Sequence, residues 1–81
     1  MYTVYILKDD KNKLYKGFTN NLDRRLKEHI SGHTRTTSKM SGLRVVYTEQ
    51  YATALEARKR ELYFKSAAGR RFLKKILGPL A

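Results

Sequence analysis

The run from Thr3 to His29 limits the fold of this 81-residue chain more than any other segment. Residues 1–8 (MYTVYILK) are mostly apolar on both alternating faces, which is typical of a strand that is covered on both sides. Residues 9–12 (DDKN) have turn chemistry, and residues 14–18 (LYKGF) are typical of a second strand. We therefore expect the two strands to form a β-hairpin.

Two tyrosines and a glycine lie on this hairpin. Because side chains alternate with period two along a strand, an odd number of loop residues places Tyr5 and Tyr15 on the same face. Gly17 falls on that face too and leaves room beside the tyrosines. Lys16 lies on the opposite face and is interpreted as a surface cation. Either tyrosine taken singly is an ordinary strand residue.

A helix is expected to follow, capped by one of two consecutive asparagines and ended by Ser31-Gly32. Its buried stripe consists of apolar residues one turn apart, Leu22, Leu26 and Ile30. Arg25 and His29 flank this stripe at the boundary between core and solvent, where the wall of a site would lie. They also fit a structural role, as an arginine whose stem covers apolar surface and a hydrogen-bonded histidine. Arg24 and Glu28 face away as an i,i+4 ion pair.

The second half of the chain predicts a third strand and two more helices. Residues 43–51 are typical of a strand, and residues 53–65 begin with a capping box that starts a helix. Residues 67–69 (AAG) are expected to interrupt it, and residues 70–77 to form a short last helix. The prediction is a single small α/β (α+β) domain over residues 1–81. A three-stranded antiparallel or mixed sheet would carry helices on its faces, in the order β-β-α-β-α-α. The hairpin follows from the residues, whereas the place of the third strand beside it rests on a family resemblance that the site residues carry.

The second helix presents one inward acid, Glu61. Its apolar flanks are Leu55 and Leu62 on one side and Ala57 and Phe64 on the other. Between the flanks lie Ala54, Arg58, Glu61 and Lys65, and the outward residues are Glu56, Lys59, Arg60 and Tyr63. A carboxylate between apolar flanks is costly unless it is paired or binds a metal. The spacing leaves both alternatives open: an ion-pair cluster with Arg58 and Lys65, and a metal ligand.

The net charge of +11 indicates the class of partner. A polyanion fits this charge, and nucleic acid fits better than an anionic membrane surface, because no basic segment also has a strongly apolar face. The candidate phosphate contacts are Arg35 and Lys39 in a polar loop, and Arg58, Lys65, Arg70, Arg71, Lys74 and Lys75. No apolar run approaches the roughly 20 residues of a membrane helix. The absence of cysteine fits a cytoplasmic protein.

Taken together, these residues resemble the GIY-YIG nuclease superfamily, and in particular its small stand-alone bacterial members. The two signature triplets correspond to Thr3-Val4-Tyr5 and Tyr15-Lys16-Gly17. Arg25 follows the second tyrosine by ten residues and His29 follows it by fourteen, as the family pattern requires. Glu61 matches the metal-binding acid of the family, and the resemblance covers almost the whole chain. Many members also carry an asparagine after the acidic helix, and this sequence has none there.

The resemblance implies metal-dependent hydrolysis of DNA phosphodiester bonds, with repair or recombination as its setting. Glu61 would hold one divalent cation, Mg²⁺ or Mn²⁺. Arg25 would pair with the phosphate, and Gly17 would let the backbone approach it. Tyr5 or Tyr15 would act as general base, and His29 would take the proton onward or orient a tyrosine. The residues do not decide between the two tyrosines.

Two other functions stay open at this level. One is a catalytically weak or inactive nucleic-acid-binding module of the same fold, which the missing asparagine favours. The other is an adaptor whose charge serves an acidic protein. Nothing in the sequence resembles a base-reading module, so recognition of nucleic acid would rest on its shape or on a partner protein that supplies specificity.

Overall fold

The structure, a computed structural model, describes residues 1–31 and 40–78, so Arg35 and Lys39 lie outside the described residues. The elements in chain order are β1 (Tyr2–Lys8), β2 (Leu14–Thr19), α1 (Leu22–Ile30), β3 (Arg44–Tyr51), α2 (Ala54–Lys65) and α3 (Ala67–Leu77). This order confirms the predicted β-β-α-β-α-α arrangement. None of the helices in the described ranges is long and apolar enough to cross a membrane.

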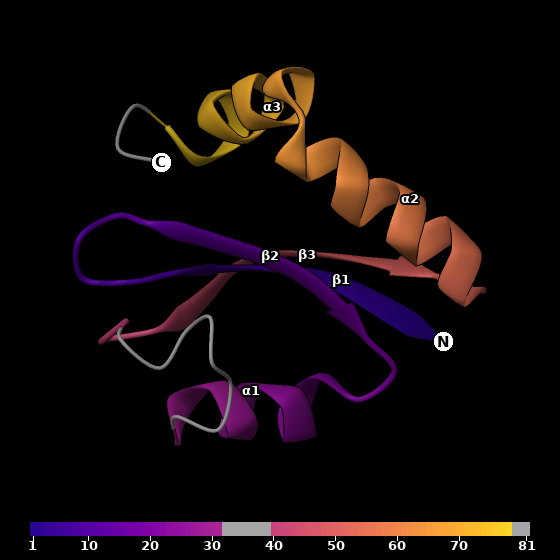
Figure 1. Cartoon of the computed structure of the whole chain (residues 1–81), viewed down its shortest axis with the longest axis horizontal. Helices are drawn as coiled ribbons and strands as arrows, with labels where there is room; N and C mark the ends of the chain where they lie inside the picture. The colour runs from indigo at the N-terminus through magenta and orange to yellow at the C-terminus, as the bar shows by residue number, and fades with distance from the viewer. Residues whose placement is uncertain (32–39, 79–81) are drawn as a thin grey trace.

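The sheet is antiparallel throughout, with β1 as its central strand in the order β2-β1-β3. Helix α1 covers one face of the sheet, and α2 and α3 cover the other (Figure 1). The central residues of β1, Val4 to Leu7, are fully buried. Helices on both faces therefore explain why the first strand is apolar on both sides.

The β1–β2 hairpin sets the positions of both tyrosines. Tyr5 pairs with Gly17 and Leu7 pairs with Tyr15, so the two tyrosines and Gly17 share the face that α1 covers. The turn is held by the buried carboxylate of Asp9, which accepts hydrogen bonds from two backbone N–H groups of the loop, at 2.9 and 2.7 Å. This local network fixes the hairpin register, and the register fixes which face each tyrosine takes.

The orientation of α2 differs from the prediction. Leu55 and Leu62 are exposed rather than packed on the flanks, and Arg58 is exposed rather than inward. Arg60 and Tyr63, which were expected to face outward, pack against the aromatic core instead. The inner face of α2 is therefore formed by Ala57, Arg60, Glu61 and Phe64.

Arg60 takes an inner position because its charge and its stem both have partners. Its guanidinium lies 4.7 Å from the ring centroids of Tyr63 and Phe64 and 5.2 Å from that of Phe72. Nε and Nη2 donate to the two carboxylate oxygens of Glu49 on β3, at 2.8 and 3.1 Å. This bidentate, stacked arrangement suits arginine specifically.

Glu49 is the centre of a larger network that ties α2 to β3. Besides Arg60, the hydroxyls of Tyr47 and Tyr51 donate to its carboxylate at 2.5 and 2.7 Å. Burial alone would raise the pKa of Glu49, but the hydrogen bonds from Arg60, Tyr47 and Tyr51 outweigh it and lower the pKa. Glu49 is therefore charged at neutral pH, and the network sets how α2 lies on the sheet.

The predicted interruption at residues 67–69 is wrong, because these residues form the first turn of α3. Ser66 alone separates the helices: it ends α2, and its side chain accepts a hydrogen bond from the Gly69 N–H at 3.2 Å. Gly69 is needed for packing rather than for a turn. A Cβ at this position would lie 1.9 Å from the carbonyl oxygen of Tyr63 and 2.6 Å from Cα of Phe64.

Gly69→Ala should therefore destabilise the protein by about 1–3 kcal/mol, although alanine is the better helix former. The added methyl group meets backbone atoms of α2 that no side-chain rotation can move, so α3 has to shift. Urea denaturation measures the change in the free energy of unfolding. Ala68→Gly, at an exposed neighbouring position of the same turn, is the control and should cost no more than about 1 kcal/mol. An unchanged or raised stability in Gly69→Ala would contradict the close packing of α2 and α3.

Candidate active site

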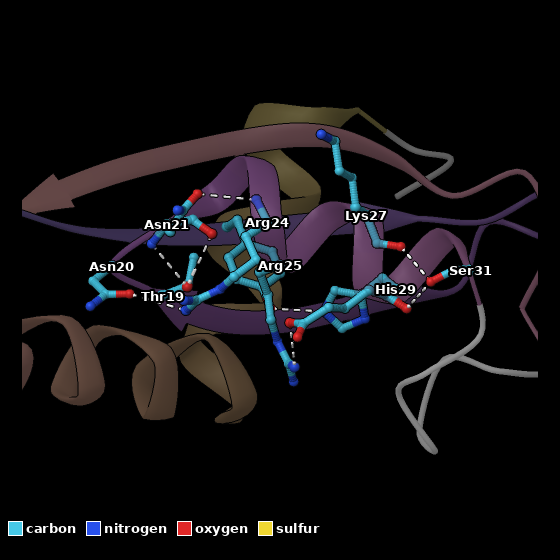
Figure 2. A network of polar contacts seen from close by, with 10 residues as sticks. Thr19, Asn20, Asn21, Arg24, Arg25, Lys27, His29 and Ser31 are labelled. Carbon is cyan, nitrogen blue, oxygen red and sulfur yellow. Dashed lines mark hydrogen bonds and ion pairs between the residues drawn. The ribbon is translucent and has the colours of Figure 1, made fainter.

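Helix α1 presents its functional residues to the hairpin from a short, well-capped segment. The Asn21 side chain accepts a hydrogen bond from the Arg24 N–H at 3.1 Å, and the Ser31 hydroxyl donates to the Lys27 carbonyl at 2.7 Å (Figure 2). These contacts define the two ends of the helix. The rotation at which α1 meets the sheet depends instead on the side chains that face the hairpin.

That rotation differs from the predicted one. His29, expected at the boundary, is only 1% exposed, whereas Ile30, expected in the buried stripe, is exposed. The reason is that His29 has a buried polar partner: the Tyr5 hydroxyl lies 2.9 Å from its Nε2. A polar ring that is hydrogen-bonded and packed on aromatic rings can be buried at little cost.

Three aromatic side chains form the centre of the site. The ring centroid of His29 lies 4.8 Å from that of Tyr15 and 5.8 Å from that of Tyr5, and the two tyrosine centroids are 6.2 Å apart. Gly17 makes room for them: a Cβ there would lie 2.7 Å from the Tyr5 hydroxyl oxygen and 3.2 Å from Cε1 of Tyr15. Any larger residue at this position would displace both tyrosines.

Arg25 lies beside the same phenols. Contact with the Tyr5 side chain is the largest effect that raises the pKa of Arg25, and contact with Tyr15 adds to it. Nη1 of Arg25 also pairs with Glu28 Oε1 at 3.2 Å. The predicted Arg24–Glu28 pair is therefore replaced by this one, and Arg24 donates to the Asn20 side chain instead, at 3.4 Å (Figure 2).

Burial controls the protonation states of Tyr5 and His29. It raises the pKa of Tyr5 to about 12, although the neighbouring Arg25 acts in the opposite direction. It also lowers the pKa of His29 from the usual 6.5, and the positive charge of Arg25 lowers it further. At neutral pH the phenol thus keeps its proton and the imidazole is neutral. If the neutral ring carries its proton on Nδ1, Nε2 accepts from the Tyr5 hydroxyl, and if it carries it on Nε2, Nε2–H donates to the phenol oxygen.

Acidification should destabilise the protein through His29. The unfolded chain binds a proton on this residue at about pH 6.5, whereas the folded protein binds it only at lower pH because the pKa is lowered. The unfolded state therefore binds more protons between these pH values, and the free energy of unfolding falls as the pH falls. His29→Gln should lose this part of the pH dependence in urea denaturation between about pH 5 and 8. His33 is present in both proteins, so equal slopes in the two proteins would contradict a lowered pKa of His29.

Glu61 lies on α2, across the sheet from α1, and is 13% exposed. Its charge nevertheless reaches the site, because it is one of the effects that raise the pKa of Tyr5. The ammonium of Lys65 lies 3.6 Å from Oε2 of Glu61, a distance typical of a loose ion pair. Both alternatives from the sequence therefore persist for Glu61. Its ion-pair partner is Lys65, and among the described residues Arg58 makes no ion pair with it.

The donor set around Glu61 fits only one kind of metal site. In residues 1–31 and 40–78, histidine and acidic side chains form no group of three that could hold a metal ion. A closed zinc or calcium site is therefore not built from these residues. Mg²⁺ differs, because it commonly binds through one or two carboxylates and keeps waters and substrate phosphates as its other ligands. A single partly buried carboxylate with a displaceable partner fits that pattern.

The comparison with known proteins agrees with this geometry. A family model described as the GIY-YIG catalytic domain matches residues 1–75. The chain belongs to the GIY-YIG family. The family model indicates a nuclease domain that acts on nucleic acid, and residues 1–75 include every residue of the aromatic cluster, Arg25 and Glu61.

Relatives of this GIY-YIG protein are small and similar along most of their length. A UPF0213 protein of Clostridium perfringens is 41% identical over 66 residues, which span 80% of this chain and 71% of that protein. A UPF0213 protein of Staphylococcus haemolyticus is 34% identical over 74 residues, 90% of each chain. The solution NMR structure of a UPF0213 protein from Bacillus halodurans has a TM-score of 0.58 at 31% identity, covering 94% of this chain and 85% of that one.

The predicted nucleic-acid contacts of this GIY-YIG domain are distributed over α2 and α3. All of those in the described ranges are exposed: Arg58, Lys65, Arg70, Arg71, Lys74 and Lys75. Lys16 was interpreted as an ordinary surface cation, but the structure places it close to two of them. Burial lowers the pKa of Lys16, and the charges of Arg70 and Lys65 lower it further. The period-two alternation that points Lys16 away from the tyrosines also points it toward α2 and α3.

Proposed function

We propose that this protein is a metal-dependent endonuclease that hydrolyses DNA phosphodiester bonds. The observation that supports it most directly is the buried hydrogen bond of 2.9 Å between the Tyr5 hydroxyl and His29 Nε2. Apolar residues would fill the same space without two buried polar groups, so packing alone does not call for this pair. A phenol next to a neutral imidazole is, in contrast, a ready path for a proton.

Tyr5 would act as the general base through His29. With a pKa of about 12, its phenol does not ionise by itself at neutral pH. It can accept a proton from the attacking water only if its own proton passes to Nε2 of His29 at the same time. His29 is neutral at that pH because its pKa is lowered, so Nε2 is able to take this proton in the tautomer that carries its own proton on Nδ1. His29 would hold this proton temporarily as an imidazolium.

Arg25 would control access to Tyr5 as well as bind phosphate. Tyr5 is only 1% exposed, and Arg25 is one of the side chains in contact with it. The Arg25 side chain is 35% exposed and its ion-pair partner Glu28 is 40% exposed, so the guanidinium can turn to an incoming phosphate without breaking a buried ion pair. Its pairing with the phosphate would offset charge that develops in the transition state and uncover Tyr5.

Glu61 would hold the divalent cation, Mg²⁺ or Mn²⁺. The cation, when bound, would polarise the phosphate and stabilise the leaving oxygen. DNA would bind mainly through its phosphates, so that affinity falls steeply with salt. We also propose a cytoplasmic role in repair or recombination, with specificity from DNA shape or from a partner protein.

The test is cleavage of labelled single-stranded, duplex, flapped and four-way DNA, in Mg²⁺ or EDTA, by the wild type and by Glu61→Gln. We expect cleavage in Mg²⁺ only, and its loss in Glu61→Gln while DNA binding survives. The substitution keeps the size of the side chain and removes its charge, so it separates metal binding from folding. Binding without cleavage of any substrate by the wild type would sink the proposal.

That outcome would favour a nucleic-acid-binding module of the same fold with weak or no catalysis. One observation already favours this second candidate: no asparagine follows α2, where many members of the family have one. The two candidates share the charged surface, so DNA affinity does not discriminate between them. Metal-dependent turnover does.

A further inference from the structure

The cations around Glu61 are arranged on three different elements. Lys65 is in the last turn of α2, and Arg70 is in the first turn of α3, just beyond the single linking residue Ser66. Lys16 is on β2, opposite Ile6 of the core-facing side of β1, and therefore points to the face that α2 and α3 cover. The chain thus brings Lys16 and Lys65 to the side of the sheet that α2 covers, with the Glu61 carboxylate beside Lys65, and Arg70 follows at the start of α3.

Helix α2 packs directly against β2, so the face of β2 that carries Lys16 lies next to the helix that ends at Lys65. Burial is the main cause that lowers the pKa of Lys16, and Arg70 and Lys65 are the next two. Like charges at short range are unfavourable unless an anion lies between them. Glu61 pairs with Lys65 and so supplies one negative charge, and no other ion pair in residues 1–31 and 40–78 neutralises Lys16 or Arg70.

We propose that Lys16, Lys65 and Arg70 form a phosphate-binding subsite beside Glu61, and that Lys65 moves from Glu61 to a DNA phosphate when a divalent cation binds Glu61. The proposal rests on the proposed function, since it takes Glu61 as the metal ligand. The subsite would be a second part of the substrate site, next to the metal ligand, and Lys65 would link the binding of the metal to the binding of DNA.

The geometry favours such an exchange of partners. The Lys65–Glu61 distance of 3.6 Å is that of a loose pair, and the Lys65 side chain is 51% exposed. A half-exposed lysine on a flexible four-carbon stem can leave its partner at small cost. A divalent cation approaching Glu61 meets Lys65 as a competitor, whereas DNA would draw Lys65 away. Metal and DNA should therefore strengthen each other's binding, and by the same factor.

The first experiment measures Mn²⁺ binding without DNA, from the electron paramagnetic resonance signal of free Mn²⁺. Lys65→Met should bind Mn²⁺ about two- to five-fold more tightly than the wild type, because the competing ammonium is gone. Lys59→Met is the matched control: the same change on the same helix, at an exposed residue in a shallow groove with Tyr51 and Tyr63. It should leave Mn²⁺ affinity unchanged. Glu61→Gln should lose the binding.

The outcomes separate this inference from the proposed function. If Glu61→Gln weakens Mn²⁺ binding but Lys65→Met binds it no more tightly than Lys59→Met does, the partner exchange is wrong and the metal ligand stands. If Glu61→Gln binds Mn²⁺ as the wild type does, the metal ligand of the proposed function is wrong, and the exchange falls with it.

The second experiment measures the affinity for a short duplex DNA in Mn²⁺ and in EDTA, with Tyr5→Phe present in every protein to prevent cleavage. Lys16→Met and Arg70→Met should weaken binding in both conditions. Lys65→Met should cost about three-fold more affinity in Mn²⁺ than in EDTA, because Lys65 is available to the phosphate only when the cation holds Glu61. An equal loss in the two conditions would overturn the exchange, and no loss in any of the three variants would overturn the subsite.

Discussion

Tyr5→Phe should slow Mg²⁺-dependent DNA cleavage by about 10²- to 10⁴-fold, the range expected when a general base is lost. The substitution removes one oxygen atom and keeps the ring that packs between Gly17 and His29. DNA affinity should change little, since the phenol is buried and lies on the face of the sheet opposite to α2 and α3, which carry most of the exposed cations. Single-turnover cleavage with excess enzyme measures the effect on the chemical step.

Tyr15→Phe is the matched comparison, because Tyr15 shares the face of the hairpin and contacts the same histidine. Its ring centroid lies 4.8 Å from that of His29, but the hydrogen bond to Nε2 belongs to Tyr5. We expect a smaller loss of rate in Tyr15→Phe. A loss in Tyr15→Phe that exceeds the loss in Tyr5→Phe would identify Tyr15 as the base and assign Tyr5 to its support.

Arg60→Met should lower the free energy of unfolding by about 2–3 kcal/mol, more than any other single exposed or half-buried charge that the structure describes on α2. Methionine replaces most of the aliphatic part of the arginine side chain over the aromatic rings. The loss of stability therefore comes mainly from the Glu49 carboxylate, which is left without its cation. Glu49 would lose two hydrogen bonds while it remains largely buried, with 16% of its side chain exposed. Urea denaturation of the variant and of the wild type gives the difference.

A double variant distinguishes the pair from simple packing. Removing both charges, with Glu49→Gln and Arg60→Met together, should recover part of the lost stability, because no buried carboxylate is then left without its cation. Lys59→Met, at the exposed position next to Arg60, should stay within about 0.5 kcal/mol of the wild type. If the double variant is less stable than Arg60→Met by the full cost of a second independent loss, the two residues do not act as a pair.

The element order and the hairpin could be predicted because their signals are local, whereas the place of β3 beside β1 was implied only by the family resemblance. The two-sided apolar pattern of residues 1–8 requires cover on both faces, and the helices supply it. The capping box at Thr53 starts α2 at the expected residue, and its side chain accepts from the Glu56 N–H. The spacing of the tyrosines places them on one face because the hairpin turn is short and well determined.

The sequence could not predict which residues of each helix face the sheet, because this depends on partners far away in the sequence. Arg60 points inward only because its guanidinium binds Glu49 on β3 and packs on the ring of Phe72 on α3. His29 is inward only because Tyr5 is there to bond it. A hydrophobic pattern assigns such residues to solvent, since it scores each side chain without its partner. The spacing on α2 offered both Arg58 and Lys65 as ion-pair partners of Glu61, and the structure pairs it with Lys65.

The central position of β1 has a consequence for synthesis. Its partner β2 follows directly, whereas its other partner places Tyr51 beside Tyr2 and is made much later. At translation rates of 5–20 residues per second, the interval between the completion of β2 and that of β3 is roughly two to six seconds. During this time one edge of a strongly apolar strand has no neighbour, which is the condition under which strands pair with the wrong chain. We therefore expect the nascent chain to be most prone to aggregation before residue 51 emerges, and chaperones that bind extended apolar segments to act in that interval.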